Sequence, residues 1–259
     1  MSLSLDSAQL DRYSRHIIMD DVGPEGQKRL LNSRALVVGA GGLGSPVIQY
    51  LAAAGVGHLT IVDDDVVERS NLQRQIVHGD ADIGRPKVDS AAAFVADLNP
   101  DITVDTHRTR VTKGNVADIV PGHDVVVDTS DNFPTRYLLN DFCRLEGIPI
   151  AHGAIYKFEG QVTTLVPDGP CYRCLFPEAP EPGTVPDCAA TAVFGVLPAT
   201  VGRLQAPEPV KLPLDVGGPP LALLLFSDAP DLSFPNASSL RTPDCPLCGD
   251  HPVDSLEGI

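Results

Sequence analysis

The chain has 259 residues, a mass of 27.4 kDa and 43% hydrophobic residues, enough to bury one substantial core or two small ones, which excludes a wholly disordered protein. It has no run of 18 apolar residues, and its first eleven residues lack the basic and apolar regions of a signal peptide, so we expect no membrane association and a cytoplasmic location. The 19 basic and 34 acidic side chains give a net charge of −15, which repels nucleic-acid backbones and anionic lipids and argues against nucleic acid as a partner.

The acidic excess has an unusual composition. Of the 34 acidic residues 26 are Asp, and only five of the 19 basic residues are Lys. Many short carboxylates with few lysines are typical of halophilic proteins, in which salt screens the repulsion between like charges. Ordinary acidic drift is the alternative.

A glycine-rich loop follows the first predicted strand. The β-prone segment Ala35–Val38 runs directly into Gly-x-Gly-x-x-Gly, and we expect Ser45 and Pro46 to start a helix that continues to Ala54 and ends at Gly55 and Gly57. The next strand, Leu59–Val62, leads to Asp63, the position of the acid that holds a ribose in nucleotide-binding βαβ units. The glycines of the loop and its flank are Gly39, Gly41, Gly42 and Gly44.

Such a loop lets the backbone approach a phosphate, which the free N–H groups of the helix N-terminus attract. A tight turn without a ligand is the alternative. The strand, the helix and Asp63 together favour a nucleotide site, but they do not distinguish ATP from NAD.

Polar residues come after the later strands as well. Asn71, Arg74 and Lys87 precede a predicted helix, Val88–Leu98, and the two cations could neutralise a triphosphate. Asp65 or Asp131 could hold a divalent cation, which prefers carboxylate and phosphate oxygens. Each residue alone is typical of a solvated surface, whereas together they lie where a doubly wound sheet binds its ligand.

The remaining predicted elements continue the alternation of strand and helix. It implies an α/β fold with a Rossmann-like, doubly wound, mostly parallel sheet, which antiparallel strands extend. The strands are Thr103–Asp105, Val125–Val127, Ile148–Ala151 and Gln161–Val166, and Pro134–Leu145 is a helix that follows Asp131 and Asn132.

Two Cys-x-x-Cys pairs lie in the last third of the chain. Cys171, Cys174, Cys245 and Cys248 offer four thiolates, the number in a closed tetrahedral zinc site. One redox-active pair is the alternative. The segment from residue 167 also holds most of the 24 prolines, so we expect a single domain with a nucleotide-binding part (1–166) and a loop-rich, zinc-binding part (167–259).

Two cysteines and one histidine stand apart from these motifs. Cys188 lies in a loop before an expected helix, where it could be a nucleophile or an inert thiol, and Asp187 beside it would disfavour the thiolate. Cys143 is expected in the core and His152 in a structural role.

Several motifs together resemble the E1-like adenylating enzymes of the MoeB/ThiF/HesA family, over about residues 12–249. They are the glycine-rich loop, Ser70–Gln75, Gly84–Lys87, Asp131-Asn132, both Cys pairs, Arg12–Arg15, Cys171–Pro177 and Gly195–Pro198. The resemblance implies ATP-dependent adenylation of the C-terminal glycine of a small ubiquitin-like, β-grasp protein that ends in Gly-Gly. It further implies sulfur transfer to molybdopterin or tRNA, protein conjugation, or both, with sulfur supplied by a separate donor protein.

The family roles map onto matching positions of this chain. The resemblance places Gly42 at the phosphates, Asp63 on the ribose, Asn71, Arg74 and Lys87 around the triphosphate, and Mg²⁺ on Asp131. It gives Cys188 as the active-site cysteine, the four paired cysteines as zinc ligands, and Arg15 as a residue that reaches the ATP of the partner in a homodimer.

One segment departs from the family pattern. Relatives continue with a helix after residue 206, but Pro207, Pro209 and Pro213 are expected to disrupt it here because proline lacks an N–H donor. The stretch 215–240 also has little family likeness. Two functions from other classes are alternatives: an NAD-dependent oxidoreductase, and a non-catalytic, zinc-stabilised binding module.

Overall fold

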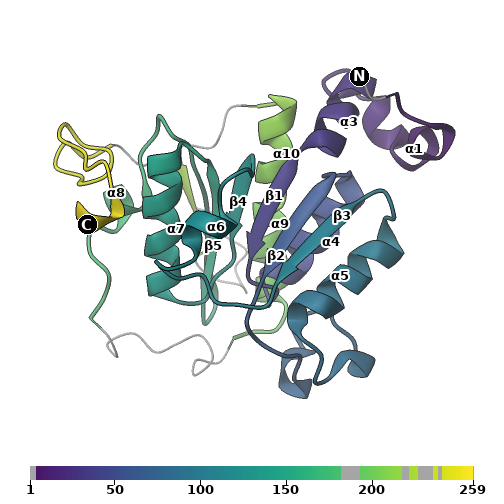
Figure 1. Ribbon diagram of the computed structural model, residues 1–259, viewed down its shortest axis with the longest axis horizontal. Helices are drawn as coiled ribbons and strands as arrows, with labels where there is room; N and C mark the ends of the chain where they lie inside the picture. Colours follow the sequence, from purple (N-terminus) through teal and green to yellow (C-terminus); the bar gives the residue numbers. More distant parts are fainter. Residues whose placement is uncertain (1–3, 182–192, 218–221, 227–235, 239–240, 259) are drawn as a thin grey trace.

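The computed structural model describes residues 4–181, 193–217, 222–226, 236–238 and 241–258. At its centre is an eight-stranded sheet with the order β3-β2-β1-β4-β5-β6-β7-β8 (Figure 1). The strands are β1 (Arg34–Val38), β2 (His58–Val62), β3 (Thr103–His107), β4 (Val125–Asp128), β5 (Ile150–Tyr156), β6 (Glu159–Leu165), β7 (Ala222–Phe226) and β8 (Asn236–Ser238). The first five are parallel and the last three are added antiparallel, which confirms the predicted fold class.

Helices cover both faces of this sheet, and the alternation within β1 shows how. Ala35 and Val37 pack into one core, and Leu36 and Val38 pack into the other. All four are buried, as in the central strand of a doubly wound fold. The first face carries α3 (Gly23–Asn32), α4 (Gly44–Ala54), α5 (Lys87–Leu98), α9 (Leu197–Gln205) and α10 (Pro207–Leu214), and the second carries α6 (Val116–Ile119), α7 (Phe133–Glu146) and α8 (Tyr172–Leu175).

The predicted start of α4 is wrong in one detail. The helix begins at Gly44, one residue earlier than expected, and Ser45 does not cap it. Instead, Ser45 Oγ donates to Gly41 O at 2.7 Å, a bond from the first turn back into the glycine-rich loop. The expected stop is confirmed, since Gly55 adopts the left-handed conformation (φ 86°) at the end of α4.

The expectation that prolines disrupt the helix after residue 206 is also wrong. Pro207 and Pro209 lie in the first turn of α10, where a backbone N–H has no partner within the helix. Pro213 lies one residue before the end, so it removes only one late hydrogen bond. Burial of Leu214 against the first core offsets that loss.

The N-terminal helices, α1 (Ser7–Arg12), α2 (Ser14–Ile17) and α3, lie at the end of the sheet where α4 and α5 finish (Figure 1). Arg12 donates to Leu98 O at 2.9 Å, and Gln27 donates to Ala54 O at 3.0 Å. Both acceptors are the last residues of their helices. Short 3-10 turns occur at Arg69–Asn71, Asp80–Asp82 and Leu256–Gly258. Among the described helices, none has the length and apolar content needed to cross a membrane.

Candidate active site

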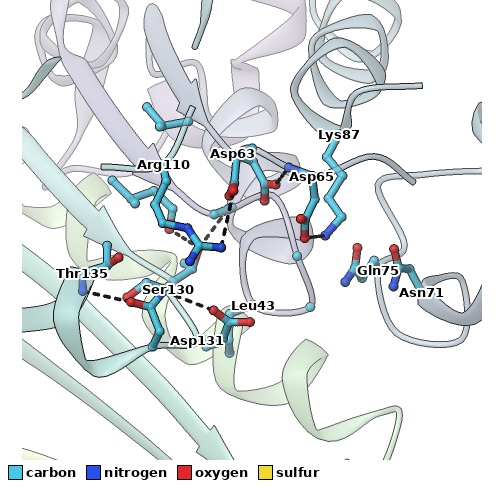
Figure 2. A pocket seen from close by; sticks show the side chains of 18 of the residues that line it. Leu43, Asp63, Asp65, Asn71, Gln75, Lys87, Arg110, Ser130, Asp131 and Thr135 are labelled. Carbon is cyan, nitrogen blue, oxygen red and sulfur yellow. Dashed lines mark hydrogen bonds and ion pairs between the residues drawn. The ribbon is translucent and has the colours of Figure 1, made fainter. Parts of the chain in front are cut away.

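A cavity of about 320 Å³ opens at the carboxyl ends of β1, β2 and β4 (Figure 2). The chain leaves β1 for β2 on one side and later returns to β4 on the other. Such a switch point leaves a crevice between oppositely directed connections, where doubly wound folds bind their ligands. Ten of the eleven residues expected to bind the nucleotide or its Mg²⁺ line it, namely Gly39, Gly41, Gly42, Asp63, Asp65, Asn71, Arg74, Lys87, Asp131 and Asn132.

The glycine-rich loop forms one wall, and two of its glycines are required by geometry. Gly39 has φ 105°, and a Cβ there would lie 2.8 Å from Thr129 Oγ1. A Cβ on Gly44 would overlap the carbonyl oxygen of Gly39. Gly44 thus closes the turn from behind and does not line the cavity. At the start of α4, Ser45 N already donates to Gly41 O at 2.9 Å and Pro46 has no N–H, so the N–H groups that a phosphate can meet are those of the glycine-rich loop.

The peptide groups of Ala40 are held from both sides. Asp63 Oδ2 accepts from Ala40 N at 2.8 Å, and Asp63 Oδ1 accepts from Asp65 N at 2.9 Å. His78 Nε2 lies 2.9 Å from Ala40 O, and His78 Nδ1 lies 2.9 Å from Ser90 Oγ. Burial raises the pKa of Asp63, which the ammonium of Lys87 opposes, whereas burial lowers the pKa of His78. A neutral His78 can therefore donate Nε2–H to the loop.

Lys87 is a buried cation with an exposed partner. Its Nζ lies 2.8 Å from Asp65 Oδ2, and the side chains are 7% and 62% exposed, respectively. Lys87 begins α5 and faces the cavity (Figure 2). Because Asp65 remains solvated, an incoming phosphate can take its place beside the ammonium.

Asn71 and Arg74 come from the turn before α5. Asn71 Oδ1 accepts from Glu68 N at 3.0 Å, which leaves its amino group to face a ligand. Arg74 donates one N–H to Ser70 O at 3.1 Å. Gln75 beside them is buried, and its Oε1 has no hydrogen-bond partner among the described residues.

The loop after β4 forms the opposite wall. Asp128 Oδ1 accepts from Ser130 Oγ at 2.6 Å and from Ser130 N at 3.0 Å. This bonding directs the chain into Asp131, which is exposed at the cavity. Asn132 Oδ1 accepts from Thr135 N at 3.0 Å, so its oxygen caps α7 while the residue lines the cavity.

The cavity lining includes polar residues that were not expected there as ligands, among them Gln75, Arg110 and Arg136. Arg110 Nη2 lies 3.4 Å from Asp64 Oδ2 at the opening, and both side chains are exposed. Arg110 follows the carboxyl end of β3, so the rule that ligand-binding residues follow strands could have found it. Gln75 ends the Ser70–Gln75 motif, which gave it no role of its own, and no local pattern distinguishes Arg136 from other polar residues on helices.

The four paired cysteines converge. Their Sγ atoms all lie within 4.8 Å of one another, with Cys171 to Cys245 at 3.5 Å and Cys174 to Cys248 at 3.2 Å. Zn–S bonds of 2.3 Å in a tetrahedron would separate the sulfurs by about 3.8 Å. The donor set and the spacing therefore fit one zinc ion.

Protonation chemistry supports the same fit. Burial raises the pKa of Cys171, so that thiol ionises only with a cation beside it. Burial alone would also raise the pKa of Cys174, but hydrogen bonds with the backbone of Thr242, the Cys248 thiol and the backbone of Cys171 lower that pKa to about 7. Gly249 is required after the second pair, because a Cβ there would overlap Pro243 O.

The remaining predicted residues lie elsewhere. Cys143 is fully buried in the second core, as expected. Cys188 lies outside the described residues. Arg15 is exposed on α2, at the end of the molecule where α4 finishes, whereas the glycine-rich loop lies at the start of α4. An 11-residue helix spans about 16 Å, so Arg15 does not reach the cavity of its own chain.

Comparisons with known proteins agree with this geometry. Residues 13–247 match the ThiF family. The chain is 70% identical to the SAMP-activating enzyme E1 of Haloferax volcanii, over 100% of this chain and 96% of that protein. It is 51% identical to the sulfur carrier protein adenylyltransferase of Thermus thermophilus, over 95% and 93% of the two chains.

Other relatives are longer or more distant. A probable adenylyltransferase/sulfurtransferase MoeZ of Mycobacterium tuberculosis is 46% identical, and the match covers 94% of this chain but 63% of that protein. The crystal structure of Escherichia coli MccB with ATP superimposes with a TM-score of 0.78 at 22% identity, over 92% of this chain and 74% of that one. That likeness concerns the fold alone.

Proposed function

The chain belongs to the ThiF family, and from that premise we propose that it adenylates the C-terminal glycine of a small ubiquitin-like, β-grasp protein with ATP. The observation that carries the proposal is the agreement between two kinds of finding. Relatives named as activating enzyme and adenylyltransferase match nearly from end to end, and the residues expected to hold a nucleotide line one cavity.

The reaction joins two anions, and the cavity can offset their repulsion. A carboxylate oxygen of the partner's terminal glycine attacks the α-phosphorus of ATP, the bond to the bridging oxygen breaks, and pyrophosphate leaves. Lys87 and Arg74 stabilise the charge that grows on the phosphates, together with the N–H groups of the glycine-rich loop. Asp63 accepts from the ribose hydroxyl groups with its remaining lone pairs.

A divalent cation completes the charge balance. The carboxylate of Asp131 is exposed at the cavity and offers the oxygen ligand that Mg²⁺ prefers. When bound, Mg²⁺ would withdraw charge from the phosphates. The four paired cysteines would hold a structural zinc ion, which leaves them no role in the adenylation itself.

The acyl adenylate is a mixed anhydride that a sulfur nucleophile can open. The thiolate of Cys188 attacks the acyl carbon and AMP leaves, which gives a thioester. The terminal sulfur of a persulfide on a separate donor protein would instead displace AMP to give an acyl disulfide, and a second thiol would then cleave its S–S bond to release a thiocarboxylate and form a disulfide. The two outcomes correspond to protein conjugation and to sulfur transfer.

ATP–pyrophosphate exchange tests the adenylation step. The assay is run in molar KCl with Mg²⁺ and a β-grasp protein ending in Gly-Gly, and the control is the same protein without its last glycine. Exchange that requires the intact terminus is the expected result. An absence of exchange despite ATP binding would favour the non-catalytic module, and NAD binding with hydride transfer would favour the oxidoreductase.

Arg15 is proposed to serve the cavity of a second copy in a homodimer. Arg15→Ala should then lower the exchange rate strongly, as Lys87→Met should. Mixed and re-associated, the two variants should recover activity, because one of the two sites in a mixed dimer holds both native residues. If the mixture stays inactive although mixed dimers form, Arg15 does not act across the dimer.

A further inference from the structure

The loop that carries Asp131 is held by two buried side chains that the adenylation chemistry does not use. Asp128 and His152 are 2% and 1% exposed, and His152 Nδ1 lies 2.8 Å from Asp128 Oδ2. Burial lowers the pKa of His152. His152 therefore donates to Asp128 as a neutral ring and fixes the carboxylate that bonds Ser130.

Arg136 is the second support. Its Nη2 donates to Ser130 O at 3.4 Å, and its guanidinium lies over the ring of Phe133, 5.0 Å from the centroid. Arg136 is buried in the cavity wall, and its Nε has no hydrogen-bond partner among the described residues. Because so few hydrogen bonds hold the guanidinium, its position depends on the side chain that its Nη1 contacts.

That contact is Tyr172, which lies between the first two cysteines of the metal cluster. Arg136 Nη1 donates to Tyr172 Oη at 3.3 Å. The ring of Tyr172 also packs on His152, with centroids 5.0 Å apart and an interplanar angle of 62°. Tyr172, which is fully buried, therefore contacts both His152 and Arg136, the two side chains through which it can affect the Asp131 loop.

The backbone fixes Tyr172 in place. Asn140 Oδ1 accepts from Tyr172 N at 2.7 Å, and the neighbouring Arg173 makes two bonds to Asp141, at 2.9 and 2.7 Å. These contacts seat the Cys171–Cys174 turn on α7. The position of Tyr172 thus depends on the fold of the metal cluster and on α7.

We propose that Tyr172 is a positioning residue that couples the four-cysteine cluster to the Mg²⁺-binding loop through His152 and Arg136. The inference rests on the proposed function, in which Asp131 holds Mg²⁺. Its consequence is that the metal cluster sets how well Asp131 is placed, in addition to stabilising the C-terminal segment.

The test measures ATP binding as a function of Mg²⁺ concentration, together with the zinc content and melting temperature of each protein. Tyr172→Phe keeps the ring on His152 and removes the hydroxyl that Arg136 contacts. The matched control is Tyr137→Phe, because Tyr137 packs against Tyr172 at 5.2 Å and its hydroxyl lies within 2.9 Å of the carbonyls of Phe176 and Glu178. Asp131→Asn gives the full contribution of the Mg²⁺ ligand.

We expect Tyr172→Phe to raise the half-saturating Mg²⁺ concentration about three- to tenfold with zinc retained, the effect of losing one hydrogen bond of ordinary strength. Tyr137→Phe should stay within about twofold of the native protein. Equal values for the two variants would overturn the coupling, even if exchange and the Asp131→Asn effect stand as proposed. If Tyr172→Phe does not fold, Arg136→Lys takes its place, since it keeps the charge but loses the planar donor set. The same three- to tenfold rise in the half-saturating Mg²⁺ concentration is then expected, and its absence would overturn the coupling.

Discussion

Lys87→Met separates a role in catalysis from a role in stability. Methionine keeps the apolar stem but removes the charge, and the partner Asp65 is 62% exposed, so its carboxylate stays hydrated. The free energy of unfolding should change by at most about 1 kcal/mol. A fixed cation at developing phosphate charge contributes about 3–4 kcal/mol, so the exchange rate should fall about 100- to 1000-fold.

The assay is ATP–pyrophosphate exchange at saturating ATP and partner protein, with urea unfolding of each variant in the same buffer. Lys211→Met is the control for exchange, because it also removes a lysine from an ion pair, 2.9 Å from Glu208, and Lys211 does not line the cavity; there the carboxylate is the more buried partner, so this variant can lose stability without losing exchange. A loss of less than tenfold for Lys87→Met, or an equal loss for Lys211→Met, would refute the assignment of Lys87 to the phosphates.

Three further expectations concern the loop, the pH dependence and the metal. Gly44→Ala should lower both the melting temperature and ATP affinity, since its Cβ would overlap Gly39 O; Gly114→Ala, whose Cβ would lie 3.7 Å from the nearest atom, should change neither. Burial lowers the pKa of His78, His123 and His152 from 6.5, so the unfolded chain binds more protons than the folded one. The free energy of unfolding should therefore fall as pH decreases below 6.5, and a constant value between pH 8 and 5 would contradict this. Cys174→Ser should lose zinc and melt at a lower temperature, while Cys143→Ser should retain zinc; metal analysis that finds zinc in both would refute the four-cysteine zinc site.

The strands and the phosphate loop could be predicted because their signals are local. Short apolar runs end in Gly39, Asp63 and Asp128, and the parallel arrangement brings such ends together. The N-terminal helix α1 was missed although it carries a signal, since Asp6 and Gln9 form a capping box. The pattern Asp-x-x-Gln at residues 6–9 therefore marks the start of this helix in the sequence.

Other features could not be derived from local patterns. His78 contacts Ala40, 38 residues earlier, and Tyr172 contacts Arg136, 36 residues earlier. Such pairs form only after the chain has folded. His78 stands in no motif, and although Tyr172 lies inside the first Cys-x-x-Cys pair, that pattern predicts a metal site and not a contact with Arg136. The helix α10 forms against the preference of its prolines because packing outweighs propensity.

The hydrogen bonds that fix Ala40 affect the thermodynamics of nucleotide binding. Because Asp63 and His78 already bond both peptide groups of this residue, the loop is ordered before a phosphate enters. A ligand then has little backbone entropy to remove, and more of its contact energy is available as affinity. Calorimetry on a His78→Ala variant should accordingly show a larger entropic penalty for ATP binding than in the native protein, while the binding enthalpy stays close to the native value.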